Sequence, residues 1–188
     1  MEDELARSMK ELKLDDEERP YYLSYLVKDV FLVNITADSG AIISNNENHS
    51  RNLIVDLRVG DYALDNSNFM SLSSSNVSSR ISHRLTKDDD YDMLRMGAWA
   101  ATDRAYMAAL DIMAKKKVAL QNTVQTDVLP DFTKGSATSA IHRKAPFSVK
   151  KDTLESMVDQ LSRLFLNQQQ IQKSKIILSV QIINWVWL

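Results

Sequence analysis

The chain has no cysteine in its 188 residues, and it is poor in glycine and proline. Without cysteine it cannot form disulfides, thiol nucleophiles or cysteine-ligated zinc sites, which suits a reducing compartment. Its four glycines are not clustered, so no phosphate-binding loop is present. No apolar run approaches the roughly 18 residues of a membrane-spanning helix, and the N-terminus lacks a signal-peptide pattern. We therefore expect a cytoplasmic protein that does not associate with membranes.

An excess of charge of either sign is also missing. The formal net charge is -2, with a pI near 5.9, and no basic patch is interleaved with aromatic residues. Because nucleic-acid binding depends on neutralising phosphates, DNA or RNA partners are not expected. A chain of this length that is 44% hydrophobic can bury one sizeable core. We expect a single domain over residues 1–188.

Alternating apolar residues predict β-strands in the first third of the chain. The alternation runs from Tyr22 to Ala37, where Asp38-Ser39-Gly40 is typical of a tight turn. A second strand then begins at 41–44. We interpret the polar run 45–50 as another turn and the alternation at 53–59 as a third strand. These strands would form an antiparallel meander.

Helical spacing predicts a short helix over Asp3–Leu14 and a long one from the Thr86–Asp89 region to about Asn122. A third helix is predicted to start at Asp152. Thr86 with Asp89, and Asp152 with Glu155, have the spacing of capping boxes. The long helix carries an apolar stripe that we assign to the core rather than to a partner groove: Met93, Met96, Trp99, Ala100, Tyr106, Met107, Leu110, Met113 and Ala114.

The remaining segments connect or end these elements. Residues 70–86 are serine-rich and predict a surface loop, and 123–150 predict an irregular connection. Residues 175–188 form an apolar, β-prone run without a closing turn, which suggests a truncated terminal strand. The expected fold is α+β: two layers, with an antiparallel-rich mixed sheet of four to six strands and two main helices packed on one face.

Residues able to do chemistry are dispersed. The three histidines lie in separate segments without a second ligand at helical spacing, so we expect structural or surface roles for His49, His83 and His142. Asp61 and Asp65 flank a turn, and Asp103 lies on or beside the apolar face of the long helix. Each could act as a general base, but a backbone cap or a buried hydrogen bond is the favoured interpretation.

Several motifs together resemble the N-terminal region of the TldD/PmbA family of zinc metallopeptidases, the "modulator of DNA gyrase" type, and in particular its long TldD-related subgroup. The resemblance covers most of Met1 to about Asn184. The motifs are Pro20–Tyr25, Gly40-Ala41, Val55–Tyr62 (VDLRVGDY), Leu64–Phe69 (LDNSNF), Asp88–Asp92, Trp99–Tyr106, Ala114–Lys117 and Leu129–Phe132.

The resemblance implies a fold module and a chemistry that this chain does not complete. Members of the family are zinc-dependent peptidases whose HExxxH motif and further ligand follow the N-terminal domain, and whose subunits pair around a shielded site. None of those ligands occurs here, so no metal or catalytic residue is assigned, zinc is expected only for the full-length family, and this chain alone is expected to be inactive. The implied partners are a peptide or unfolded polypeptide and a second subunit in a homo- or heterodimer.

One group of residues is a candidate for substrate binding or dimer contact. It consists of Arg58, Asp61, Tyr62, Asp65, Asn66 and Asn68. A turn-forming structural role is at least as well supported for these residues. Two functions stay open: a non-catalytic N-terminal module of a TldD/PmbA-like peptidase, or a free-standing interaction protein whose exposed sheet edge pairs with a partner or itself.

Overall fold

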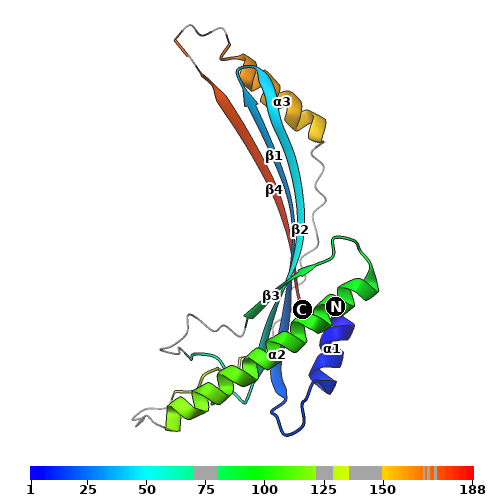
Figure 1. The fold of residues 1–188 in the computed structure, drawn as a ribbon, viewed down its shortest axis with the longest axis vertical. Coiled ribbons are helices and arrows are strands. Elements are labelled where there is room, and N and C mark those ends of the chain that lie inside the picture. Colours follow the sequence, from blue (N-terminus) through cyan, green and yellow to red (C-terminus); the bar gives the residue numbers. More distant parts are fainter. Residues whose placement is uncertain (70–79, 122–128, 136–149, 167, 169, 172) are drawn as a thin grey trace. The chain divides into compact units, whose positions relative to one another are not determined.

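The computed structural model describes residues 1–69, 80–121, 129–135, 150–166, 168, 170–171 and 173–188. In this part of the chain the fold is α+β, as predicted, with helices packed on a four-stranded antiparallel sheet of order β3-β2-β1-β4 (Figure 1). The elements are α1 (Glu2–Glu11), β1 (Pro20–Asp38), β2 (Ala41–Val59), β3 (Arg80–Leu85), α2 (Tyr91–Gln121), α3 (Lys151–Arg163) and β4 (Lys175–Trp187).

The chain divides into two compact units. Unit 1 contains Met1–Lys28, Arg51–Ala140 and Trp185–Leu188, and unit 2 contains Asp29–Ser50 and Ile141–Asn184. The strands β1, β2 and β4 each contribute residues to both units. The single domain expected over residues 1–188 stays a prediction.

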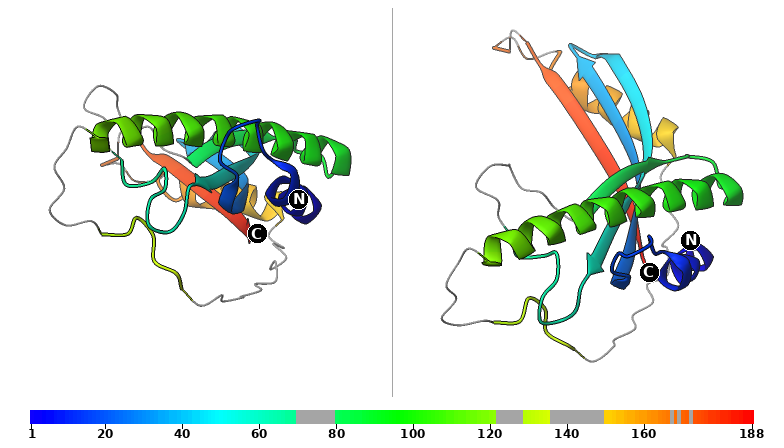
Figure 2. Two further views of the ribbon diagram at one scale, coloured as in Figure 1. Left: turned by 90° about the horizontal axis from the view of Figure 1, so that it is seen from below. Right: turned by 60° about the horizontal axis from the view of Figure 1, so that its bottom comes forward.

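The core of unit 1 lies between α2 and the sheet. The buried face of α2 is made of small residues, and Ala98, Ala101, Ala105 and Ala109 are all inaccessible to solvent. They pack in one cluster with Leu23 and Tyr25 of β1 and with Leu53, Val55, Leu57 and Val59 of β2. Small side chains let a helix lie close to a sheet, and Figure 2 shows α2 crossing the strands with α1 beside it.

The predicted core stripe of α2 is wrong for four of its large side chains. Met93, Met96, Trp99 and Met107 are between 50% and 57% exposed, whereas Tyr106 and Met113 are buried. The helix is apolar on two faces, and tertiary packing selects the alanine face because it fits the closely packed sheet. The side chains of Met93, Met96, Trp99 and Met107 therefore point outward.

The core of unit 2 lies between α3 and the β1–β2 hairpin. Leu154 and Val158 of α3 pack on Val33, Ile35 and Ala37 of β1. The predicted hairpin turn is confirmed, with positive φ at Ser39 (48°) and Gly40 (81°). The Gly40 N–H donates to Ser162 Oγ at 2.8 Å, which connects the turn to the last turn of α3.

Two strand predictions are wrong. The polar run 45–50 is not a turn, because β2 continues from Ala41 to Val59. Its polar side chains find partners within unit 2: Asn45 donates to Glu155, and His49 Nε2 lies 2.6 Å from Asp29 Oδ1. Within the predicted 70–86 loop, Arg80–Leu85 forms β3, paired antiparallel with β2, and 70–79 lie outside the described residues.

The capping predictions are also wrong in detail. The N-terminus of α2 is capped by Asp90, whose Oδ1 accepts from the Met93 N–H at 2.9 Å, instead of by Thr86. No side chain caps α3, because the helix begins at Lys151 with Lys150 as its N-cap residue, and Glu155 accepts from Asn45. The predicted terminal strand is confirmed as β4. Of the predicted 123–150 connection, the described residues 129–135 are irregular.

No helix within the described residues has the length and apolar character needed to cross a membrane.

Candidate functional site

The turn that follows β2 in unit 1 has a fixed backbone. Gly60 has a φ of +97° and forms an isolated antiparallel bridge with Asp65. A side chain at Gly60 would place its Cβ 2.3 Å from the Leu64 carbonyl oxygen, so only glycine fits. Asp61 Oδ1 accepts the N–H groups of Ala63 and Leu64 at 2.8 and 2.9 Å. The loop is thus closed by its own backbone and by one carboxylate.

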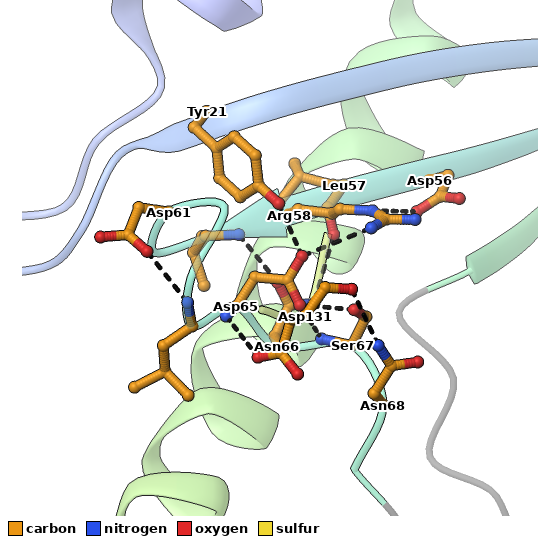
Figure 3. A network of polar contacts seen from close by, with 12 residues as sticks. Tyr21, Asp56, Leu57, Arg58, Asp61, Asp65, Asn66, Ser67, Asn68 and Asp131 are labelled. Atoms are coloured by element: carbon orange, nitrogen blue, oxygen red, sulfur yellow. Dashed lines mark hydrogen bonds and ion pairs between the residues drawn. The ribbon is translucent and has the colours of Figure 1, made fainter. Parts of the chain in front are cut away.

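Asp65 is the centre of the network that this turn carries (Figure 3). Its side chain is completely buried. One carboxylate oxygen accepts the N–H and hydroxyl of Ser67. The other accepts the Tyr21 hydroxyl at 2.6 Å and lies 3.4 Å from Arg58 Nη1.

The ionisation of these buried groups follows from their contacts. Burial would raise the pKa of Asp65, but hydrogen bonds from Ser67 and Tyr21, together with the charge of Arg58, more than offset it and lower the pKa. Burial and the hydrogen bond to Asp65 raise the pKa of Tyr21. The pair is therefore a carboxylate and a neutral phenol at neutral pH.

A buried lysine of α2 connects the turn to a second segment. Lys116, only 5% exposed, donates to the carbonyl oxygens of Asp65 and Ser67 at 2.9 and 2.7 Å. It also pairs with the Asp131 carboxylate. Asp131 in turn accepts the Asp65 N–H at 2.9 Å. Lys116 thus holds α2, the β2 turn and residues 129–135 together.

Two asparagines complete the hydrogen bonding of this region. Asn66 accepts the Val59 N–H at 2.8 Å and donates to the Leu57 carbonyl at 3.3 Å, so it extends the pairing at the end of β2. Asn68 has a φ of 54° and donates to the Asp131 carbonyl at 2.9 Å. Both amides satisfy backbone groups.

Arg58 lies against a group of aromatic rings. Its guanidinium carbon is 4.0 Å from the Phe132 ring centroid and 5.3 Å from that of Tyr22. Phe132 stacks on Tyr62 at 5.9 Å, and Tyr62 contacts Tyr21 at 5.2 Å. Of these rings, Tyr62 is the most accessible, at 40% exposed. This arrangement stabilises Arg58 through cation–π contacts and its ion pairs.

The structure brings all six predicted site residues into this one region: Arg58, Asp61, Tyr62, Asp65, Asn66 and Asn68. The prediction missed Tyr21, Lys116, Asp131 and Phe132 as members of the network. Each of them lies in a motif that carries the resemblance to the TldD/PmbA family. The sequence therefore pointed to these residues but assigned them no role. Whether the region binds a substrate or a subunit stays a prediction.

The chemistry of this region is that of a scaffold. Its acids accept backbone N–H groups or pair with Arg58 and Lys116, as the favoured interpretation of Asp61 and Asp65 expected. Asp103 was expected to form a backbone cap or a buried hydrogen bond, but it is exposed and not buried. Among the described residues there is no group of three or more histidines, aspartates or glutamates arranged to hold a metal ion.

A second feature of unit 1 is an open hollow of about 400 Å³ between α1 and α2. It is lined by Glu4, Arg7, Asp92, Arg95, Met96 and Trp99. The buried Glu4 carboxylate accepts from both Arg7 and Arg95, and these contacts lower its pKa against the effect of burial. With two acids and two guanidiniums, the wall has no net charge.

Comparisons with known proteins are sparse. No family model matches the chain, and neither does any curated protein. Among solved structures, the chain is similar to TldE from Thermococcus kodakarensis, with a TM-score of 0.38 and 10% sequence identity. The match covers 88% of this chain and 34% of that one, so this chain spans about a third of that protein's length.

Proposed function

We propose that this chain is a non-catalytic module of a TldD/PmbA-like metallopeptidase that binds an extended polypeptide along the free edge of its sheet. The observation that supports the proposal is the position of β4. It is the terminal strand of the order β3-β2-β1-β4, and no strand within the described residues occupies its outer edge. A free edge offers a row of unpaired backbone donors and acceptors.

This edge lacks the protection that natural edge strands carry. The run Ile176–Trp187 contains no charged residue and no proline, and Ile177 and Ile183 are exposed on it. Charges, prolines and bulges normally prevent an edge from pairing with another chain. An unprotected edge of this length suits a strand whose role is to be covered.

The outward-pointing donors follow from the pairing with β1. Tyr25 and Leu188 exchange both backbone hydrogen bonds at 2.9 Å, which makes them a hydrogen-bonded antiparallel pair. Because the direction of N–H groups alternates along a strand, counting back from Leu188 leaves Ser179, Gln181 and Ile183 with N–H groups toward the free edge. These residues belong to unit 2.

The family part of the proposal rests on the motifs that resemble TldD/PmbA proteins. In that setting the module positions a peptide substrate or pairs with a second subunit, and the zinc-dependent chemistry belongs to another part of the protein. The genomic sequence after the Leu188 codon tests this part. A continuing frame that encodes HExxxH supports it, and an immediate stop favours a free-standing interaction protein that uses the same edge.

The edge itself is tested with a fluorescent peptide that copies residues 175–184. We expect its anisotropy to rise with protein concentration. A peptide of the same sequence with all of its backbone nitrogens methylated has the same side chains but cannot donate hydrogen bonds along either edge. It is expected not to bind.

A matched pair of proline variants locates the site. Gln181→Pro removes an outward N–H and leaves the bonds to β1 intact, so it should abolish peptide binding without unfolding the sheet. Val180→Pro removes a donor to β1 and should destabilise unit 2. Equal binding of both peptides, or unchanged binding by Gln181→Pro, would show that the edge is not the binding site.

A further inference from the structure

The outward face of α2 carries a second feature that the sheet edge does not explain. Eight residues on this face repeat at alternating spacings of three and four, which is a heptad pattern: Met93, Met96, Ala100, Asp103, Met107, Leu110, Ala114 and Lys117. We refer to them as the outer seam. Six are exposed, and Ala100 and Leu110 are partly exposed. Six of the eight are apolar.

A water-exposed heptad seam on a 31-residue helix is costly unless another helix covers it. The opposite face of α2 already supplies the core of unit 1 through its alanines. Apart from Leu110, which also packs against this core, the outer seam is therefore surplus to the fold of this unit. It is also rich in methionine, whose flexible side chains adapt to a packed partner.

We infer that the outer seam binds a second copy of this chain, with the two α2 helices packed antiparallel across a two-fold axis. Charge complementarity supports this partner and selects one register. When Met107 lies opposite Leu110 of the copy, Arg104 and Asp111 on the flank of the seam face each other across the axis, and symmetry forms that pair twice.

The two polar members of the seam fit the same register. Lys117 of the copy lies opposite Ala100, one turn from Asp103, so the lysine reaches the aspartate. On the other flank Trp99, half exposed in the single chain, borders the seam. Both polar members of the seam thus gain a complementary neighbour.

Other arrangements place like charges together. Shifting one helix by a heptad in one direction places Arg104 opposite Arg104 of the second copy. Shifting it in the other direction places Asp111 opposite Asp111 of the second copy. A parallel pair sets Asp103 against Asp103 and Lys117 against Lys117. Like-charge contacts of this kind disfavour the wrong registers, which is how coiled coils specify their partners.

The charged groups already have contacts within one chain. Arg104 contacts His83, Asp111 pairs with Lys115 at 2.6 Å, and Lys117 pairs with Glu18. These pairs are exposed and exchange readily, because surface ion pairs contribute little. They leave the side chains able to turn toward a second copy.

Sedimentation equilibrium of the full chain tests the inference. The chain is expected to dimerise with rising concentration, and Met107→Glu should remain monomeric because it places a carboxylate in the seam of both copies. Arg104→Glu and Asp111→Arg should each weaken dimerisation by about ten-fold. The double variant Arg104→Glu/Asp111→Arg should restore it, because the swapped pair forms again.

Lys87→Glu, which changes the net charge outside the seam, is the matched control and should dimerise like the original chain. Circular dichroism of each variant verifies that α2 is retained. A chain that stays monomeric at millimolar concentration, a dimer that survives Met107→Glu, or a double variant that is not restored would each overturn the inference. These results are independent of peptide binding at β4, which Gln181→Pro removes separately.

Discussion

At the scale of single residues, Lys116 connects three parts of unit 1, because its ammonium group joins α2 to two loops. Lys116→Met removes this cation and leaves the mostly buried Asp131 carboxylate, 13% exposed, without its partner. Breaking a buried ion pair from one side costs about 3–5 kcal/mol. Urea unfolding should show a loss of that size. The adjacent Lys115→Met, which removes an exposed pair with Asp111, should lose only about 0.3–0.5 kcal/mol.

Gly60 offers a test of backbone conformation with an internal control. At its φ of +97°, the added methyl of Gly60→Ala would meet the Leu64 carbonyl, so we expect a loss of more than about 1 kcal/mol in the free energy of unfolding. Gly135→Ala meets nothing within 4 Å and should change the stability by less than about 0.5 kcal/mol. Equal effects of the two substitutions would contradict the turn described above.

The lowered pKa of Asp65 predicts how the free energy of unfolding depends on pH. Its pKa is lower in the folded chain than in the unfolded chain, so the unfolded state takes up the proton first as the pH falls. The stability that Asp65 contributes is complete above its ordinary pKa of 3.8 and disappears as the pH falls through the lower folded value. Denaturant unfolding between pH 7 and pH 2 should therefore show Asp65→Asn less stable than the original chain at pH 7, with the difference shrinking in acid.

A difference that does not change with pH would mean that Asp65 acts through its shape and not through its charge. Glu4, whose pKa is also lowered, contributes an acid dependence of the same sign and remains in both proteins. The comparison of the two proteins therefore isolates Asp65.

The members of the site could be predicted only in part. Arg58 through Asn68 are close in sequence, and a turn with aspartate and asparagine residues brings such neighbours together whatever the rest of the fold does. Lys116 and Asp131 are distant in sequence, and their inclusion depends on where α2 crosses the sheet. Local patterns contain no information on that crossing.

At the scale of elements, one of the contacts that hold α3 to the β1–β2 hairpin is a buried hydroxyl. Ser162 is completely buried and accepts the Gly40 N–H at 2.8 Å. Ser162→Ala leaves that N–H without its partner, which costs about 1–3 kcal/mol. Amide exchange at Gly40 should become faster in this variant. Ser156→Ala, on the exposed face of α3, should leave that exchange unchanged.

The elements also show where sequence patterns succeed and fail. The alternation in β1 and the length of α2 gave correct predictions because one periodicity dominates each segment. The polar run inside β2 was misread as a turn, since Asn45 and His49 are stabilised by partners far away in sequence. The apolar stripe of α2 was assigned to the core, but the alanine face competed for that position and packs more closely.

At the scale of the whole molecule, the three tryptophans report on what covers its surfaces. Trp99, Trp185 and Trp187 are between 50% and 62% exposed. Because indole emission moves to longer wavelength when water surrounds the ring, a single chain already emits much as the unfolded chain does. At low concentration, urea unfolding should therefore change the emission maximum only slightly, although circular dichroism shows the full transition.

Raising the concentration should move the emission to shorter wavelength if α2 pairs with α2, because Trp99 borders the outer seam and is then shielded from water by the second copy. Trp99→Phe should lose this shift, and Trp187→Phe should retain it, since Trp187 lies on β4 and not on α2. A shift that follows Trp187 instead would indicate association through the sheet edge. A large shift to longer wavelength on unfolding at low concentration would show that these rings are buried in the single chain. It would contradict the exposure of the β4 edge and of the outer seam of α2, on which both proposals depend.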